Sequence, residues 1–173
     1  MAAVTRLITL GDAAALARLQ TTNRDYLAPW SPLQEERYFT EEGQREVLGR
    51  DLTAYARGGM LPLAILDGGG AVCGRINLNT IVRGAFQSAS VGYWVSESHI
   101  GRGLASAALA DAVGIGFGEL GLHRLEAATL LHNTPSQHVL ARTGFRPFAV
   151  CEKYLKIAGK WQDHILFVLL NKE

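Results

Sequence analysis

The chain has 173 residues, 48% hydrophobic and 19% charged, which is the composition of a folded globular protein and excludes a disordered one. Its 17 basic and 16 acidic side chains give a net charge of +1, which argues against a broad electrostatic grip on nucleic acid. No apolar run reaches the roughly 20 residues that cross a bilayer, so we expect no membrane partner. With only two cysteines, Cys73 and Cys151, we expect a protein of the reducing cytoplasm.

The first third of the chain predicts a strand followed by two helices. Residues 4–10 alternate as a strand does, and residues 11–27 have helical spacing. Two prolines make residues 28–39 a loop. A second helix is expected over residues 40–59, with Thr40 as its N-cap and a pair of glycines at its end.

The middle of the chain predicts an antiparallel meander. Strand patterns follow one another at residues 60–66, 71–82 and 87–96. Asp67 and the three glycines after it make the first connection a hairpin turn, and the short stretch 83–86 makes the second.

The remaining segments alternate between helices and strands. We expect a helix over residues 103–121, weakened by glycines in its second half, and a strand over 123–131. A helix over 134–144 precedes two strands at 145–157 and 163–170. This order predicts one mixed α/β domain spanning all 173 residues, and it differs from a regular doubly wound sheet.

The stretch "IGRGLAS", residues 100–106, lies between a predicted strand and a predicted helix, where proteins build anion sites. The first amides of a helix lack partners and carry the positive end of its dipole. The glycines keep side chains away from these amides, and Arg102 adds a cation. The alternative is a glycine turn that only joins a strand to a helix.

Three nucleotide sites use such a loop. A P-loop would end in Gly-Lys-Ser/Thr, and a Rossmann fingerprint would need a βαβ unit, so the antiparallel strand order favours the pyrophosphate of an acyl-coenzyme A. The motif "IGRGLA" resembles the Q/R-x-x-G-x-G/A signature of GCN5-related N-acetyltransferases, with Ile100 where that family usually has Gln or Arg. The segment "HNTPSQHVLARTGF" resembles the asparagine-led segment of the same family.

The resemblance implies a GNAT fold, in which helices flank a mixed, mostly antiparallel sheet of six to seven strands. It also implies acetyl-CoA as co-substrate and no metal; the five histidines show no metal-ligand spacing. The cofactor-binding residues that it implies are Val95, Gly101, Arg102, Gly103, Leu104, Ala105, Ser106, Asn133 and Ser136.

Three further segments, "NRDYLAPWSP", "NTIVRGAFQSASVGYWV" and "YLKIAGKWQDHILF", are similar to the ribosomal-protein-alanine N-acetyltransferases, which acetylate the α-amine of ribosomal proteins. The expected partner is therefore the N-terminus of a ribosomal protein. We expect the enzyme itself to be a monomer or a homodimer. Two alternatives stay open: an acetyltransferase for a small amine such as an antibiotic or an aminoacyl nucleotide, and a non-catalytic acyl-CoA-binding module.

Acetyl transfer to an amine needs a base, a donor to the developing oxyanion and a route for the thiolate to leave. The family resemblance makes the Val95 amide the candidate oxyanion donor, on a strand separated from its neighbour by a bulge in "GYWVSE". Ser136 is the candidate to hydrogen-bond or protonate the thiolate, or it merely caps a helix. Glu97 and Glu152 are candidate bases, with a water relay as the alternative.

Aromatic and basic side chains in loops and strands are candidates for the walls of the acceptor groove, although each has an alternative role in packing or in shaping a turn. They are Trp30, Arg83, Phe86, Tyr93 and Tyr154.

Overall fold

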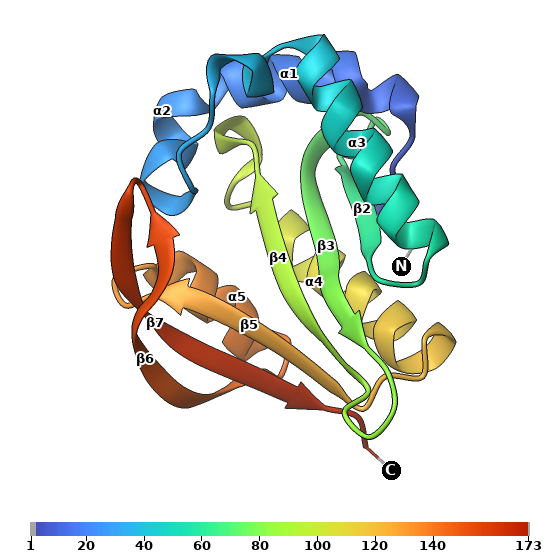
Figure 1. The fold of residues 1–173 in the computed structure, drawn as a ribbon, viewed down its shortest axis with the longest axis vertical. Coiled ribbons are helices and arrows are strands. Elements are labelled where there is room, and N and C mark those ends of the chain that lie inside the picture. Colours follow the sequence, from blue (N-terminus) through green and yellow to red (C-terminus); the bar gives the residue numbers. More distant parts are fainter. Residues whose placement is uncertain (1–2, 173) are drawn as a thin grey trace.

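A computed structural model describes residues 3–172 of the chain. Figure 1 shows one twisted sheet of seven strands in the order β1-β2-β3-β4-β5-β7-β6, with helices on both faces. The strands are β1 (Thr5–Leu7), β2 (Leu61–Leu66), β3 (Val72–Val82), β4 (Ser88–Val95), β5 (Arg124–Leu130), β6 (Arg146–Ile157) and β7 (Lys160–Leu170). All neighbours are antiparallel except β4 and β5, which are parallel. The predicted mixed, mostly antiparallel sheet is confirmed.

The helices divide between the two faces of the sheet. They are α1 (Ala13–Thr22), α2 (Arg24–Leu27), α3 (Glu41–Ala56), α4 (Leu104–Gly114) and α5 (Thr134–Arg142), with short turns η1 (Leu10–Asp12), η2 (Ala28–Trp30), η3 (Glu36–Phe39), η4 (Glu97–His99) and η5 (Ile115–Glu119). On β2, Leu63 packs into the cluster that includes α4 and α5, whereas its neighbour Ala64 packs into the cluster with α1 and α3. Because successive strand residues face opposite sides, the two helix pairs cover opposite faces.

The feature that shapes the site is the divergence of β4 from β5. These strands pair only over Ser88–Val91 and Arg124–Ala127. Beyond this stretch β4 follows β3 as far as Val95, while β5 follows β7 as far as Leu130, so a wedge opens between them (Figure 1).

The bulge expected in "GYWVSE" was a wrong prediction. Residues 92–95 pair with β3 in unbroken register. The irregularity lies instead between Asn79 and Val82 of β3, where Thr80 has a φ of 50°. The wedge forms without a bulge because each strand keeps a different neighbour.

Several element boundaries differ from the predicted ones, in one case because of a contact between distant segments. The helix expected over 11–27 is interrupted at Asn23, whose buried side chain donates to Leu19 O and accepts from the amide of Glu97, both at 2.8 Å. The loop expected at 28–39 contains the turns η2 and η3. The helix expected over 103–121 is α-helical only as far as Gly114, and the next five residues form the π-helical turn η5.

Two predicted features, the N-cap at Thr40 and the hairpin turn at Asp67, are confirmed. Thr40 Oγ1 accepts from the amide of Gly43 at 3.1 Å and caps α3. Asp67 Oδ1 accepts from the amides of Gly69 and Ala71, each at 2.9 Å, and closes the β2–β3 hairpin. Over residues 3–172, no helix is both long and apolar enough to cross a bilayer.

Candidate functional site

The last residue of β4 presents its amide to the wedge. Ser96 N donates to Cys73 O of β3 at 2.8 Å. Because N–H groups alternate between the two edges of an antiparallel strand, the amide of Val95 points away from β3. It therefore faces the space between β4 and β5, where it is free to bind an oxygen.

The glycine loop after β4 leads directly into α4. Gly101 and Gly103 have φ values of 73° and 76°, in the left-handed region that favours glycine. A Cβ added at either position would meet no protein atom within 4 Å, so the space beside them is open to a ligand. No side chain caps α4, which leaves its first amides as hydrogen-bond donors.

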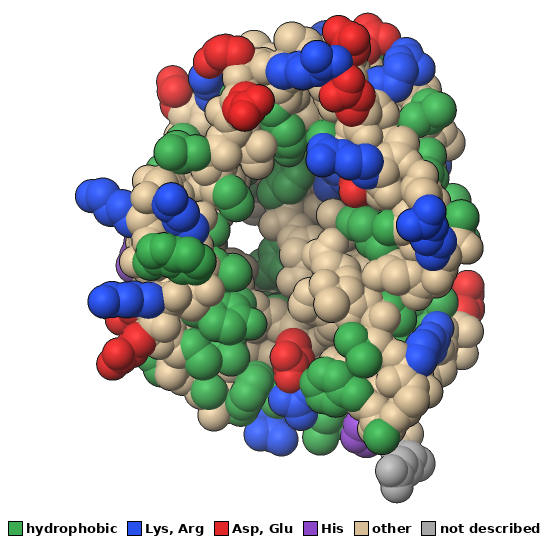
Figure 2. Space-filling model, viewed as in Figure 1, with side chains coloured by type: hydrophobic (Ala, Val, Ile, Leu, Met, Phe, Trp, Pro, Cys, Tyr) green, Lys and Arg blue, Asp and Glu red, His purple; other side chains and the backbone are tan. Residues whose placement is uncertain are grey.

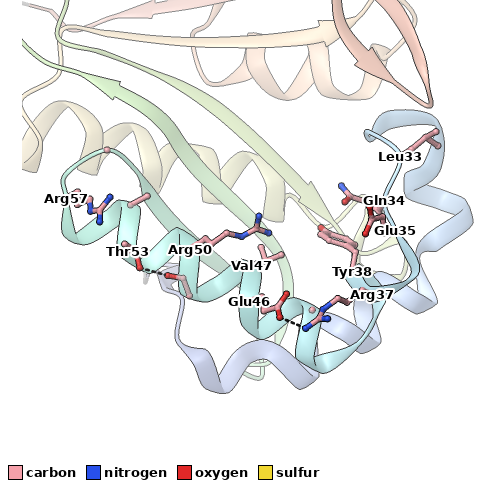
Figure 3. A pocket seen from close by; sticks show the side chains of 14 residues that line it. Leu33, Gln34, Glu35, Arg37, Tyr38, Glu46, Val47, Arg50, Thr53 and Arg57 are labelled. Atoms are coloured by element: carbon pink, nitrogen blue, oxygen red, sulfur yellow. Dashed lines mark hydrogen bonds and ion pairs between the residues drawn. The ribbon is translucent and has the colours of Figure 1, made fainter.

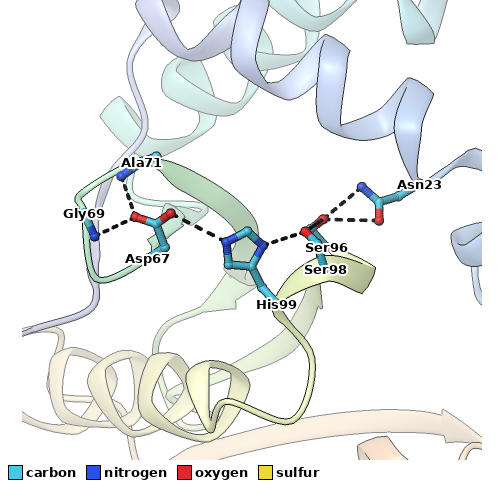
Figure 4. A network of polar contacts seen from close by, with 7 residues as sticks. All are labelled: Asn23, Asp67, Gly69, Ala71, Ser96, Ser98 and His99. Atoms are coloured by element: carbon cyan, nitrogen blue, oxygen red, sulfur yellow. Dashed lines mark hydrogen bonds and ion pairs between the residues drawn. The ribbon is translucent and has the colours of Figure 1, made fainter.

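A chain of polar contacts holds the start of this loop (Figure 4). Asp67 Oδ2 lies 3.5 Å from His99 Nε2, and His99 Nδ1 lies 2.9 Å from Ser98 Oγ. Ser98 Oγ contacts Ser96 Oγ at 3.1 Å, and Asn23 Nδ2 donates to the same Ser96 oxygen at 3.1 Å. The contacts link the β2–β3 hairpin to the end of α1 through the residues that follow Val95.

Beside the loop lies a cavity of ≈ 470 Å³, which we call the loop cavity. This volume lies in the usual range for small-molecule sites. Residues lining it are Tyr26, Leu27, Trp30, Tyr93, Trp94, Val95, His99, Ile100, Gly101, Gly103, Leu104, Ala105, Ser106, Asn133, Pro135, Ser136, Val139 and Arg142. The lining thus brings together every residue predicted to bind the cofactor except Arg102, which is exposed and lies outside it.

A smaller cavity of ≈ 200 Å³, the inner cavity, lies within the wedge itself. It shares Trp30, Tyr93, Asn133 and Ser136 with the loop cavity. The remaining lining residues are Val91, Gly92, Ala127, Ala128, Thr129, Leu130, Leu140, Leu155, Ile157 and His164. Figure 2 shows an opening that passes through the molecule on the side of β4 where Figure 1 shows the wedge. Because the two cavities share four lining residues, they adjoin, and we call them together the passage.

The shared wall contains a pair of hydroxyl groups. Tyr93 Oη lies 2.9 Å from Ser136 Oγ and 3.2 Å from Ser136 O. Burial raises the pKa of Tyr93 to about 12, partly offset by the hydrogen bond to Ser136, so the phenol stays protonated at neutral pH. The resemblance of the asparagine-led segment suggested the place of Ser136, but nothing in the sequence indicated its contact with Tyr93.

The N-terminus of α5 positions the second motif. Asn133 caps this helix, with Oδ1 accepting from the amide of Ser136 at 3.3 Å. Arg142 also lines the loop cavity, a residue that the sequence analysis missed. Its separation from Pro135 and Val139 places all three on one face of α5, so helical spacing from the motif could have identified it.

The two candidate bases from the sequence analysis lie outside both cavities. Glu97 is exposed in η4, although its charge helps raise the pKa of Tyr26 after the larger effect of burial. Glu152 is exposed on β6. Within residues 3–172, neither lining includes an Asp or a Glu. The structure therefore does not bring these carboxylates to the passage.

The acceptor-groove candidates separate into two groups. Trp30 and Tyr93 line both cavities, and Trp30 packs against His132 with ring centroids 5.4 Å apart. Tyr154 lines neither cavity, but it packs against His164 of the inner cavity at 5.8 Å. Arg83 and Phe86 were wrongly placed at the groove. They lie in the β3–β4 turn, at the end of β4 opposite Val95, and Arg83 instead donates to Leu120 O.

A larger hollow, ≈ 1100 Å³, lies elsewhere (Figure 3). It is an open depression between α3 and the segment around η3, lined by Tyr38, Val47 and Arg50 among others. None of its lining residues belongs to the glycine loop, the wedge or α5, so size alone does not make it the candidate site.

Comparisons with known proteins find one family over most of the chain. Residues 4–146 match the family of acetyltransferase (GNAT) domains. The ribosomal protein uS5-alanine N-acetyltransferase of Escherichia coli (strain K12) is 32% identical over 171 residues, covering 98% of this chain and 88% of that protein. Mycobacterium smegmatis RimJ, solved in complex with CoA-disulfide, is 33% identical with a TM-score of 0.92, covering 96% of this chain and 80% of that one. The ribosomal-protein-S5-alanine acetyltransferase from Vibrio fischeri is 31% identical with a TM-score of 0.92, covering 98% and 93%.

Proposed function

The chain belongs to the family of acetyltransferase (GNAT) domains and is an acetyl-CoA-dependent N-acetyltransferase, and we propose that its acceptor is the N-terminal alanine of a ribosomal protein. The observation that carries this proposal is likeness over nearly the full chain to enzymes named for that activity. Ribosomal proteins are made in the cytoplasm, where we propose that the enzyme works.

The composition of the passage also favours a peptide end over a polyamine or an aminoglycoside. Polycationic small amines are held by several carboxylates, and none lines either cavity within the described residues. A peptide N-terminus brings a single positive charge. Trp30, at the junction of the two cavities, offers it an apolar wall.

The donor side of the proposal rests on the loop cavity. Acetyl-CoA supplies an acetyl group already activated as a thioester. The amides that begin α4, from Leu104 to Ser106, would hold its pyrophosphate, with Arg102 and Arg142 as nearby cations. Asn133 would hydrogen-bond the pantetheine arm while it caps α5.

The chemistry falls to groups on β4 and α5. The amide of Val95 would donate to the thioester oxygen as negative charge develops there. Ser136 Oγ–H would donate to the departing sulfur if the phenol of Tyr93 donates to Ser136 Oγ, since the serine hydrogen is then free. In the other arrangement the phenol donates to Ser136 O, 3.2 Å away, and its oxygen accepts from Ser136 Oγ.

The test is thiol release from acetyl-CoA with a panel of acceptors. We expect turnover with short peptides that begin with a free alanine and none with the same peptides blocked at the N-terminus. Turnover confined to polyamines, aminoglycosides or aminoacyl nucleotides would replace this acceptor with a small amine. If the protein binds acetyl-CoA but acetylates none of these acceptors, the proposed acceptor, an N-terminal alanine, is contradicted.

A further inference from the structure

A histidine outside both sequence motifs lies at the inner cavity. His164 stands in β7, opposite Leu130 of β5 and Cys151 of β6. Only 2% of it is exposed, yet it lines the inner cavity together with Tyr93 and Ser136. The small volume of that cavity, ≈ 200 Å³, keeps these side chains around one shared space.

The hydrogen bonding of His164 fixes which nitrogen is available. Its Nδ1 lies 2.9 Å from the carbonyl oxygen of Gln162. Because a carbonyl only accepts, Nδ1 carries the hydrogen, and the lone pair of the neutral ring resides on Nε2. Nε2 makes no hydrogen bond to any residue in the range 3–172. Unlike a fully buried atom, it keeps some accessible surface. It is therefore open to a group in the cavity.

Within the described residues, three other ionisable side chains face His164. Tyr154 and Cys151 face it from β6, and Tyr93 lies across the cavity on β4. The residues contributed by β5, α5 and η2 do not ionise, and no carboxylate of the described residues lines the space. In the loop cavity, His99 already has both ring nitrogens engaged, by Asp67 and Ser98.

We propose that His164 Nε2 is the base that accepts the proton of the acceptor amine, directly or through one water. The amine arrives as an ammonium ion and gives one proton to Nε2. Its lone pair then forms the C–N bond to the acetyl carbon as the C–S bond breaks. The second amine proton passes to the thiolate, with Ser136 as the nearest hydroxyl, and His164 later releases its proton to water. This assignment rests on the acetyl-transfer reaction and holds for any primary amine.

The variant His164→Asn tests the role with little change in hydrogen bonding. The Asn amide can take the place of Nδ1–H toward Gln162, while nothing replaces Nε2. We expect kcat/KM for an Ala peptide to fall by about 100-fold near neutral pH. The deficit should shrink as pH rises past the amine's pKa of roughly 7.7–8, because solvent then removes the proton. A merely structural role would give a deficit that does not change with pH.

His123→Asn is the matched control, because His123 is exposed at the far end of β5 and lies outside both cavities. Glu152→Gln and Glu97→Gln complete the set. The assignment is overturned if H164N keeps the wild-type rate, if its deficit is constant with pH, or if a glutamate variant shows the pH-dependent loss instead.

An independent readout is the ¹⁵N NMR signature of the imidazole in the wild-type protein. We expect the tautomer with hydrogen on Nδ1, and the opposite tautomer would overturn the assignment whatever the acceptor is. Failure of the wild-type enzyme on Ala peptides contradicts the proposed acceptor alone, and the H164N profile is then measured with the amine that does turn over.

Discussion

Tyr93 Oη and Ser136 Oγ lie 2.9 Å apart and join β4 to the first turn of α5 across the wedge. The two residues are separated by 43 positions in the sequence. Their contact lies where the loop cavity meets the inner cavity, so a group that moves between donor and acceptor passes this pair.

Replacing Ser136 by Ala should lower kcat by about 100-fold, since the departing sulfur loses its hydrogen-bond donor. Tyr93→Phe should cost less, about tenfold, because the serine keeps its own hydrogen. The double variant should resemble S136A alone, since both residues act through one hydrogen bond. Steady-state kinetics, with acetyl-CoA affinity measured separately, would check this.

Tyr55→Phe is the control for loss of a phenol, because Tyr55 is 41% exposed on α3 and away from both cavities. Unchanged kcat in S136A would show that Ser136 serves the helix and not the thiolate.

Elements with local signals were predictable from the sequence, whereas contacts between distant segments were not. Thr40 and Asp67 direct their own turns through bonds to residues nearby in sequence. Asn23 breaks its helix by bonding Glu97, a partner 74 positions away, which no local pattern encodes.

The same limit applies to the candidate site. The glycine spacing of the cofactor loop is visible in the sequence because φ there must be positive. His164 reaches the inner cavity only through the register of β7 against β5. Arg83 and Phe86 take the alternative role of shaping the β3–β4 turn, and no local signal in that turn says at which end of β4 the site lies.

Gly103→Ala should weaken acetyl-CoA binding and also cost about 1–2 kcal/mol of stability, because a side chain is strained at its φ of 76°. Gly84→Ala provides the matched control. Gly84 has a φ of 71° and no atom within 4 Å of an added Cβ, but it lies in the β3–β4 turn.

G84A should show the same loss of stability with unchanged acetyl-CoA affinity. Calorimetric titration with acetyl-CoA and thermal unfolding separate the two effects. Equal affinities in G103A and G84A would argue against a role of the loop in binding.

Gly74→Ala should damage the position of the Val95 amide. An added Cβ would lie 2.3 Å from Trp94 O and 3.0 Å from Val95 Cα, so β3 and β4 would have to move apart. We expect a loss of about 1–3 kcal/mol in the free energy of unfolding, together with a lower kcat.

Gly114→Ala is the comparison for this change, since an added Cβ there meets nothing within 4 Å at the end of α4. It should leave stability unchanged or raise it by up to about 1 kcal/mol. A wild-type kcat in G74A, measured on folded protein, would count against Val95 as the oxyanion donor.

Asp12 should make stability depend on pH in the acid range. Its carboxylate accepts from Arg6 at 2.7 and 2.9 Å and from the amide of Thr9 at 2.8 Å. The hydrogen bond from Arg6 is the largest cause that holds the pKa of Asp12 below its ordinary value. The native state therefore binds this proton less readily than the unfolded chain, whose Asp pKa is about 3.9.

It follows that the stabilisation by Asp12 is complete above about pH 4 and is lost as the pH falls through the lower native pKa. Asp12→Asn should cost about 1.5–3 kcal/mol near neutral pH and flatten the acid side of the stability curve. Glu41→Gln, which removes an exposed partner of Arg45, should change stability by less than about 0.5 kcal/mol. Urea unfolding across the acid range distinguishes them, because an equally steep acid loss in D12N would assign that loss to other carboxylates.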